Sequence, residues 1–168
     1  MRRRCSECEF VLYANPASAA AGVVLDDAGR VLLVRRAIEP YKGYWALPAG
    51  YQEIDEEPEI AVAREVREEA SLEVSVLGLL DLIFVQNDPR KPANVAVYLC
   101  RAHSGELSAG SDVTDVGWFA LDDLPAEIGF DNYRRVLRRL ADRALWPKSV
   151  WLALEELIDG VGRSGAPE

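Results

Sequence analysis

The chain has 168 residues, of which 49% are hydrophobic and 28% are charged, and its formal net charge at pH 7 is −9. This composition is typical of a soluble globular protein, and the length suits one domain with a sizeable core. The acidic balance argues against binding to a nucleic-acid backbone. No apolar run approaches the roughly 20 residues of a membrane span, and no segment resembles a signal peptide. With three cysteines and no such signal, we expect a cytoplasmic protein.

The first half of the chain predicts three strands and a helix behind an N-terminal arm over residues 1–16. Residues 19–25 and 30–36 read as strands, and the sequence Asp26-Asp27-Ala28-Gly29 between them favours a hairpin turn. A short strand over 44–50 delivers its end into a glycine-containing loop. Pro58 suits the first position of a helix, because its missing N–H costs nothing there.

The second half of the chain predicts further strands and then helices. Residues 73–86 are largely apolar and form two strands or one long bent strand. The remaining segments are predicted, in chain order, as a polar loop (87–94), two strands (95–103 and 115–119), an amphipathic helix (133–145), a helical extension (146–159) and a disordered tail (160–168). We therefore expect a single α/β domain over residues 17–145.

Carboxylates are concentrated where the loop after residue 50 meets the first helix. Glu65, Glu68 and Glu69 have the i, i+3, i+4 spacing that places side chains on one side of a helix. Like charges at this spacing repel each other, but a hard divalent cation with oxygen ligands would turn the repulsion into binding. A solvated acidic face is the simpler interpretation of such a run.

Two features favour a metal site over a solvated face. Apolar residues predicted on the opposite side of the helix would pack it on a core, namely Ile60, Ala63, Val66 and Ala70. The preceding strand ends in a loop with Gly50, so the carboxylates gather where loop meets helix. We therefore predict a metal site that serves a phosphate-containing ligand.

The frame Gly50-x5-Glu56-x7-Arg64-Glu65-Val66-x-Glu68-Glu69-x2-Leu72 resembles the signature of the Nudix hydrolases. These enzymes cleave a nucleoside diphosphate linked to another moiety, using Mg²⁺ or Mn²⁺. Further segments in the family's order extend the resemblance over about residues 17–140: VLLVRR from residue 31, GYWALP from residue 43, VGWF from residue 116 and Leu124-Pro125. The resemblance implies a Nudix-type α/β/α sandwich with a mixed β-sheet and the acidic helix.

Three positions depart from the family pattern. Ala49, Asp55 and Ser71 stand where the family commonly has glycine. Ser71 matters most, because glycine after a helix normally supplies a left-handed C-cap. Serine there costs some stability but removes no metal ligand.

The resemblance also implies a role for each signature residue. The metal ligands would be Glu65, Glu68, Glu69, the backbone carbonyl of Ala49 and, inside the loop, Glu53. Glu65 or Glu69 would also help to deprotonate the attacking water, and Glu56 and Arg64 would form an ion pair that orients the helix.

Other candidate site residues lie outside the signature. Arg35 and Arg36 alternate at a strand end, so one of them is expected to face the substrate phosphates. Tyr44 and Trp45 are candidate substrate contacts, although core packing explains Trp45 equally well. In some relatives the general base lies on another loop, and here the candidates are Asp88, Asp112 and Asp115. Aromatic residues that could stack on a base are Tyr41, Tyr44, Phe130 and Tyr133, with plain packing favoured for Tyr133.

The N-terminal arm is similar to the end of a zinc ribbon that precedes some bacterial Nudix domains. Cys5 and Cys8 form one pair where that subgroup has two, Cys100 lies in a predicted strand, and His103 suits a strand end. A structural Zn²⁺ site takes four ligands, so a complete site within one chain is not expected. We interpret the pair as a zinc-ribbon remnant, and a Zn²⁺ ion shared between two subunits is the alternative.

The closest-looking subgroup includes pyrophosphatases of ADP-ribose, NADH and FAD. We therefore predict a metal-dependent pyrophosphohydrolase of a small nucleotide, with no nucleic-acid or membrane partner and with a homodimer left open. The alternative is a non-hydrolytic binder or regulator on the same fold, which would be expected to lose one of the acidic ligands. A third hypothesis, an isomerase of isoprenoid diphosphates, would want a cysteine near the pocket.

Overall fold

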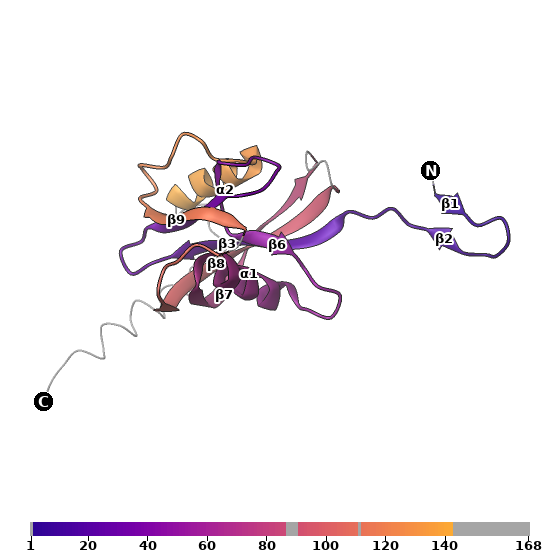
Figure 1. Ribbon diagram of the computed structural model, residues 1–168, viewed down its shortest axis with the longest axis horizontal. Helices are drawn as coiled ribbons and strands as arrows, with labels where there is room; N and C mark the ends of the chain where they lie inside the picture. The colour runs from indigo at the N-terminus through magenta and orange to yellow at the C-terminus, as the bar shows by residue number, and fades with distance from the viewer. Residues whose placement is uncertain (1, 87–90, 111, 143–168) are drawn as a thin grey trace, which may run out of the picture.

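A computed structural model describes residues 2–86, 91–110 and 112–142 of the chain (Figure 1). The predicted helical extension over 146–159 and the predicted tail over 160–168 lie outside these residues. So does Asp88, one of the candidate bases.

A mixed β-sheet forms the middle layer of the domain. Its main path runs β5-β4-β3-β8-β7, with β6 paired to β3 and β9 paired to β4. The central strand β3 runs parallel to β8 and antiparallel to β6, with Ala20 opposite Gly50. The strands are β3 (Ala17–Leu25), β4 (Val31–Arg36), β5 (Trp45–Ala46), β6 (Ala49–Tyr51), β7 (Leu72–Val85), β8 (Ala93–Gly105) and β9 (Val113–Phe119).

One helix packs on each face of this sheet, α1 (Pro58–Ala70) on one side and α2 (Asp131–Ala141) on the other (Figure 1). Because side chains alternate along a strand, β3 serves both layers. Its Ala20 and Val24 join the core under α1, whereas Ala21 and Val23 join the core under α2. The predicted α/β/α sandwich is confirmed. No helix in the described part of the chain is long and apolar enough to cross a membrane.

Several predicted boundaries change in the structure for identifiable reasons. The strand expected over 44–50 is divided into β5 and β6 around Pro48, which has no N–H to donate to a neighbouring strand. The segment expected over 73–86 is one long strand, and three register shifts against β8 bend it. Helix α2 begins at Asp131, two residues before the predicted start.

The prediction of which residues α1 buries is wrong in part. Ile60 is 58% exposed and Ala63 is only half-buried, while Val66 and Ala70 are buried as expected. The buried residues of the helix are Ala61, Val62, Val66 and Ala70, and the half-buried Glu65 and Glu69 follow Ala61 at four-residue steps. Glu65 and Glu69 therefore continue the row that begins at Ala61, so they lie beside the apolar side of the helix and not opposite to it.

The arm carries a small separate hairpin. Strands β1 (Arg3–Arg4) and β2 (Val11–Leu12) pair antiparallel with each other and with no strand of the main sheet. Figure 1 shows this hairpin projecting away from the sandwich.

Candidate active site

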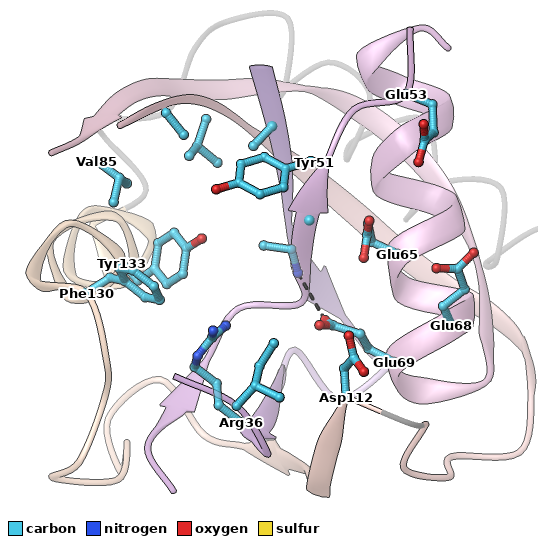
Figure 2. A pocket seen from close by; sticks show the side chains of 16 residues that line it. Arg36, Tyr51, Glu53, Glu65, Glu68, Glu69, Val85, Asp112, Phe130 and Tyr133 are labelled. Carbon is cyan, nitrogen blue, oxygen red and sulfur yellow. Dashed lines mark hydrogen bonds between the residues drawn. The ribbon is translucent and has the colours of Figure 1, made fainter. Parts of the chain in front are cut away.

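A pocket of about 320 Å³ lies between α1, β6 and the N-terminal end of α2 (Figure 2). One side is acidic and the other is aromatic, and Arg36 lies between the two. The acids are Glu53, Glu65, Glu68, Glu69 and Asp112, the aromatic residues are Tyr51, Phe130 and Tyr133, and Ala19, Val85, Ala93 and Val95 of the sheet add apolar surface.

Strand β6 and helix α1 approach each other closely at Gly50. A Cβ atom at this position would collide with the carboxylate of Glu65, so only glycine leaves room for that side chain. One residue earlier, the N–H of Ala49 donates a 3.0 Å hydrogen bond to Oε2 of Glu69 (dashed in Figure 2). Strand β6 thus leaves space for the carboxylate of Glu65 at Gly50 and binds the carboxylate of Glu69 at Ala49.

Arg64 connects three carboxylates to the loop before α1. Its Nε and Nη2 bind the two carboxylate oxygens of Glu56 at 2.9 and 3.0 Å, which is the predicted ion pair in a bidentate geometry. Its Nη1 donates to Glu65 at 2.7 Å and to Glu68 at 3.1 Å, and Nη2 also donates to the carbonyl of Tyr51. Hydrogen bonding to Arg64 lowers the pKa of Glu56. Arg64 therefore holds these carboxylates in place, but it also hydrogen-bonds to Glu65 and Glu68, which are two of the predicted metal ligands.

The buried acids of α1 have altered acidity. Burial raises the pKa of Glu69 to about 8, against the opposing effects of the Ala49 N–H and the charge of Arg36. The charges of Glu65 and Asp112 raise it further. Burial also raises the pKa of Glu65, although Arg64 opposes that shift. Two carboxyl groups that resist ionisation in one pocket indicate a site built for function more than for stability.

The loop between β8 and β9 brings Asp112 to the pocket. The N–H groups of Ser108 and Gly110 donate to the carbonyls of Ala70 and Glu69 at 3.1 and 3.0 Å, and so pair carbonyls that the end of α1 would otherwise leave unpaired. Figure 2 shows the Asp112 carboxylate beside that of Glu69. Of the described base candidates, Asp112 lines the pocket and Asp115 does not; the Asp115 carboxylate accepts a hydrogen bond from Val116.

Of the predicted substrate contacts, one lines the pocket and three do not. Arg36 lines the pocket, where its Nε donates to the carbonyl of Pro40 at 2.7 Å and its guanidinium lies 5.4 Å from the centre of the Phe130 ring. Arg35, Tyr44 and Trp45 are not among the lining residues. Arg35 donates to the carbonyl of Gly43, and Trp45 packs edge-on against Phe119.

The pocket includes residues that the sequence did not single out. Tyr51 follows Ala49 by two positions in β6, so strand alternation could have placed both on one side. Ile38 and the apolar residues of β3, β7 and β8 come together only through the pairing of distant strands, which the sequence does not specify.

The acidic residues do not form a finished metal cage as they stand. Within the described residues, no three His, Cys, Asp or Glu side chains are close enough together to hold a metal ion. Glu68 and Glu65 bind Arg64, and Glu69 binds the Ala49 N–H. The donor set nevertheless consists of carboxylate oxygens, which are the ligands that Mg²⁺ and Mn²⁺ prefer.

Comparison with known proteins identifies the family. The NUDIX domain profile matches residues 15–140. An ADP-ribose pyrophosphatase of Methanocaldococcus jannaschii is 37% identical over 125 residues, covering 74% of this chain and 73% of that protein. A MutT-like protein of Streptomyces ambofaciens is 38% identical over 62% of this chain, which spans 64% of that protein's length. A NUDIX hydrolase structure from Nitrosomonas europaea has a TM-score of 0.76 at 28% identity, covering 85% of this chain and 80% of that one.

The fold and the acidic pocket on α1 thus agree with the sequence matches. The chain belongs to the Nudix family. Its enzyme class is that of the Nudix pyrophosphohydrolases.

Proposed function

We propose that this pocket hydrolyses the pyrophosphate bond of a nucleoside diphosphate linked to another moiety, with ADP-ribose as the first candidate and NADH and FAD as the next. The observation that carries the proposal is the meeting of the buried carboxylates Glu65 and Glu69 with Arg36 and an aromatic wall in one pocket. The similarity to an ADP-ribose pyrophosphatase supports ADP-ribose.

Mg²⁺ or Mn²⁺ is the proposed cofactor, with Glu65, Glu68 and Glu69 as its ligands, joined by Glu53 and the carbonyl of Ala49. The fit rests on the buried carboxyls of Glu65 and Glu69, because ionising them in this pocket calls for a positive charge. Glu68 is 56% exposed, so its side chain has the rotamer freedom to exchange Arg64 for a cation. When bound, a divalent cation would neutralise phosphate oxygens and lower the pKa of a coordinated water.

Proton transfer from the attacking water is assigned to the acids beside the cation. Glu65 and Glu69 are the candidates for this base within the signature, and Asp112, whose carboxylate lies beside that of Glu69, is the candidate outside it. Glu56 and Arg64 act on these residues by holding α1 and its carboxylates in place.

The other half of the pocket is proposed to bind the nucleotide. Tyr51 and Phe130 offer ring faces on which a base can stack, and the buried Tyr133 packs against Phe130 at 5.2 Å between ring centres. Arg36 stands between these rings and the acids, so its guanidinium is placed to bind a phosphate oxygen. Phe130 is itself supported by Tyr41, at 4.7 Å between ring centres.

A product assay tests this proposal. The parent protein is incubated with Mg²⁺ or Mn²⁺ and, separately, with ADP-ribose, NADH, FAD, a diadenosine polyphosphate and a nucleoside triphosphate. Cleavage of ADP-ribose to AMP and ribose 5-phosphate, lost on chelation of the metal, is the expected result. Binding of ADP-ribose without any product would contradict the proposal and support the non-hydrolytic binder.

The structure speaks against the isomerase hypothesis. Cys100 is the only cysteine outside the arm, and it is fully buried in the core under α1. Burial raises the pKa of its thiol to about 12. Cys100 is not among the residues that line the pocket, so it offers neither a nucleophile nor an acid there.

A further inference from the structure

Two large residues at the edge of the pocket have positive φ angles, 63° for Tyr41 and 60° for Phe130. Bulky residues adopt such angles at a cost in free energy, and they keep them only where the surrounding structure holds them there. Tyr41 and Phe130 come from different loops, yet their rings pack together with 4.7 Å between centres. Both strained positions therefore serve the same contact.

Backbone hydrogen bonds fix the two loops that carry these rings. The N–H of Gly129 donates to the carbonyl of Trp45 in β5, and the N–H of Trp45 donates to the carbonyl of Glu127, both at 2.8 Å. In the other loop, the N–H of Tyr44 donates to the carbonyl of Tyr41 at 3.0 Å. A Cβ atom at Gly129 would lie only 3.0 Å from Cβ of Tyr41. The two loops are thus in close contact, and Tyr41 has a fixed place between them.

The same two loops hold Arg36. Its Nε donates to the carbonyl of Pro40, the residue before Tyr41, at 2.7 Å. Its guanidinium lies 5.4 Å from the centre of the Phe130 ring, which is within the range of a cation–π interaction. The carbonyl of Arg36 also accepts a hydrogen bond from the N–H of Gly43 at 2.9 Å. Arg36 lines the pocket, whereas Tyr41 lies behind it and is not among the lining residues.

Packing does not explain an aromatic residue at position 41. Tyr41 is only half-buried and is not part of either hydrophobic core. Glycine or asparagine would adopt its backbone conformation at a lower cost. The ring contacts of Tyr41 are with Tyr44 and with Phe130, and Phe130 is the ring that carries the guanidinium of Arg36. The strain at Tyr41 is therefore spent beside an arginine of the pocket.

We propose that Tyr41 is a positioning residue for substrate binding, which acts by holding Phe130 and the carbonyl of Pro40 against Arg36. An arginine side chain loses much rotamer freedom when it binds a ligand, and holding it in place beforehand reduces that cost. The guanidinium is then ready to bind a phosphate oxygen. This inference rests on the proposed function, in which Arg36 binds a phosphate of the substrate.

A double-mutant cycle between Tyr41 and Arg36 tests the inference. Tyr41→Asn removes the ring and suits the left-handed backbone, and Tyr41→Phe keeps the ring. With Mg²⁺ and ADP-ribose, Tyr41→Asn should raise KM at least about threefold and leave kcat near the parental value, because interacting residues are commonly coupled by such amounts. Tyr41→Asn should have no further effect on KM when it is added to Arg36→Ala. Tyr41→Phe should behave as the parent.

Equal effects of Tyr41→Asn in the parent and in Arg36→Ala would overturn the inference, because they would show that Tyr41 does not act through Arg36. A fall in kcat at unchanged KM, or a Tyr41→Phe variant that behaves as Tyr41→Asn, would also contradict it. Denaturant unfolding checks the fold of each variant, and Tyr41→Gly, which also suits a positive φ, replaces Tyr41→Asn if that variant does not fold.

Failure of the proposed hydrolase can be told apart from failure of this inference. If the parent binds ADP-ribose without cleaving it, no turnover disturbs a titration, and the same cycle is measured in Kd. Coupled effects on Kd would then support the role of Tyr41 although hydrolysis had failed. Independent effects on Kd would contradict it.

Discussion

Glu69 is the residue whose pKa the geometry of the site changes most clearly. Its carboxyl group lies in the pocket, bound to the Ala49 N–H and next to Glu65 and Asp112. Packing alone would favour an apolar residue in this row of α1, which begins with the fully buried Ala61. The acid at this position therefore lowers the stability of the metal-free protein in favour of a function.

The first prediction concerns pH. The pKa of Glu69 rises from 4.5 to about 8 on folding, so between these values the folded chain binds more protons than the unfolded chain. The free energy of unfolding of the metal-free protein should therefore fall as pH rises through this window. Denaturant unfolding in the presence of a chelator, at several pH values from 5 to 8, measures this slope.

Glu69→Gln should reduce the slope without abolishing it, because the raised pKa of Glu65 acts in the same direction. Glu59→Gln, an exposed position on the same helix, should keep the parental slope. Equal slopes in the parent and Glu69→Gln would show that Glu69 is not held protonated by the fold.

The second prediction concerns Gly50. Gly50→Ala should displace the Glu65 carboxylate, because the added Cβ would occupy its place. Because the displaced atoms are the far end of a flexible side chain, the free energy of unfolding should change little. We expect a loss of most hydrolytic activity, measured on the same preparation. Full activity in this variant would remove Glu65 from the proposed ligand set.

At the scale of the elements, the site depends on how α1 begins and ends. The helix starts at Pro58, as predicted, and stops at Ser71, whose φ of 58° and ψ of 29° are left-handed. Ser108 and Gly110 hydrogen-bond to this end of the helix, and Asp112 lies in the pocket. The predicted cost of serine at a left-handed C-cap therefore falls at the end of the helix that carries Glu65, Glu68 and Glu69.

The third prediction follows from this cap. Ser71→Gly should raise the free energy of unfolding by about 1 kcal/mol, because glycine adopts the left-handed conformation without the Cβ penalty. Its activity should equal that of the parent. Ser75→Gly is the matched control, because Ser75 is exposed in the extended strand β7, where glycine should destabilise. Destabilisation by Ser71→Gly would contradict the assignment of strain to this position.

The strand, loop and helix around the acidic signature could be predicted from the sequence, because their signals are local: the glycine loop, Pro58 and the four-residue spacing of the acids. The wrong assignment of Ile60 and Ala63 has a physical cause. A pattern search treats glutamate as a surface residue, whereas Glu65 and Glu69 occupy the buried side of α1. The sequence predicted where the helix begins, but it predicted only in part which side of the helix faces the sheet.

At the scale of the whole molecule, the pocket is made by parts from both faces of the sheet. Helix α1 supplies the acids, and the start of α2 supplies Phe130 and Tyr133. The sheet residues that line it, such as Ala93 and Ala19, come together through the parallel pairing of β3 with β8. Such long-range pairing leaves no local signal, so the aromatic half of the site could not be assembled from the sequence.

The fourth prediction separates the two arginines that end β4. Arg36→Ala should raise KM for ADP-ribose about tenfold or more, because a hydrogen bond to a charged group contributes about 1.5–3 kcal/mol. Arg35→Ala should leave KM near the parental value, because Arg35 does not line the pocket. Steady-state kinetics of both variants at saturating Mg²⁺ distinguish them, and equal effects would contradict the assignment of Arg36 to the phosphates.

The acids of α1 are proposed to hold a cation for pyrophosphate hydrolysis. The most direct measurement is ADP-ribose hydrolysis against Mg²⁺ concentration for the parent, Glu68→Gln and Glu59→Gln. Glu68→Gln removes one ligand charge with little change in volume, so we predict at least about a tenfold loss of activity or of apparent metal affinity. Glu59→Gln, on the same helix but outside the pocket, should behave as the parent. Undiminished, Mg²⁺-dependent turnover by folded Glu68→Gln would contradict the account.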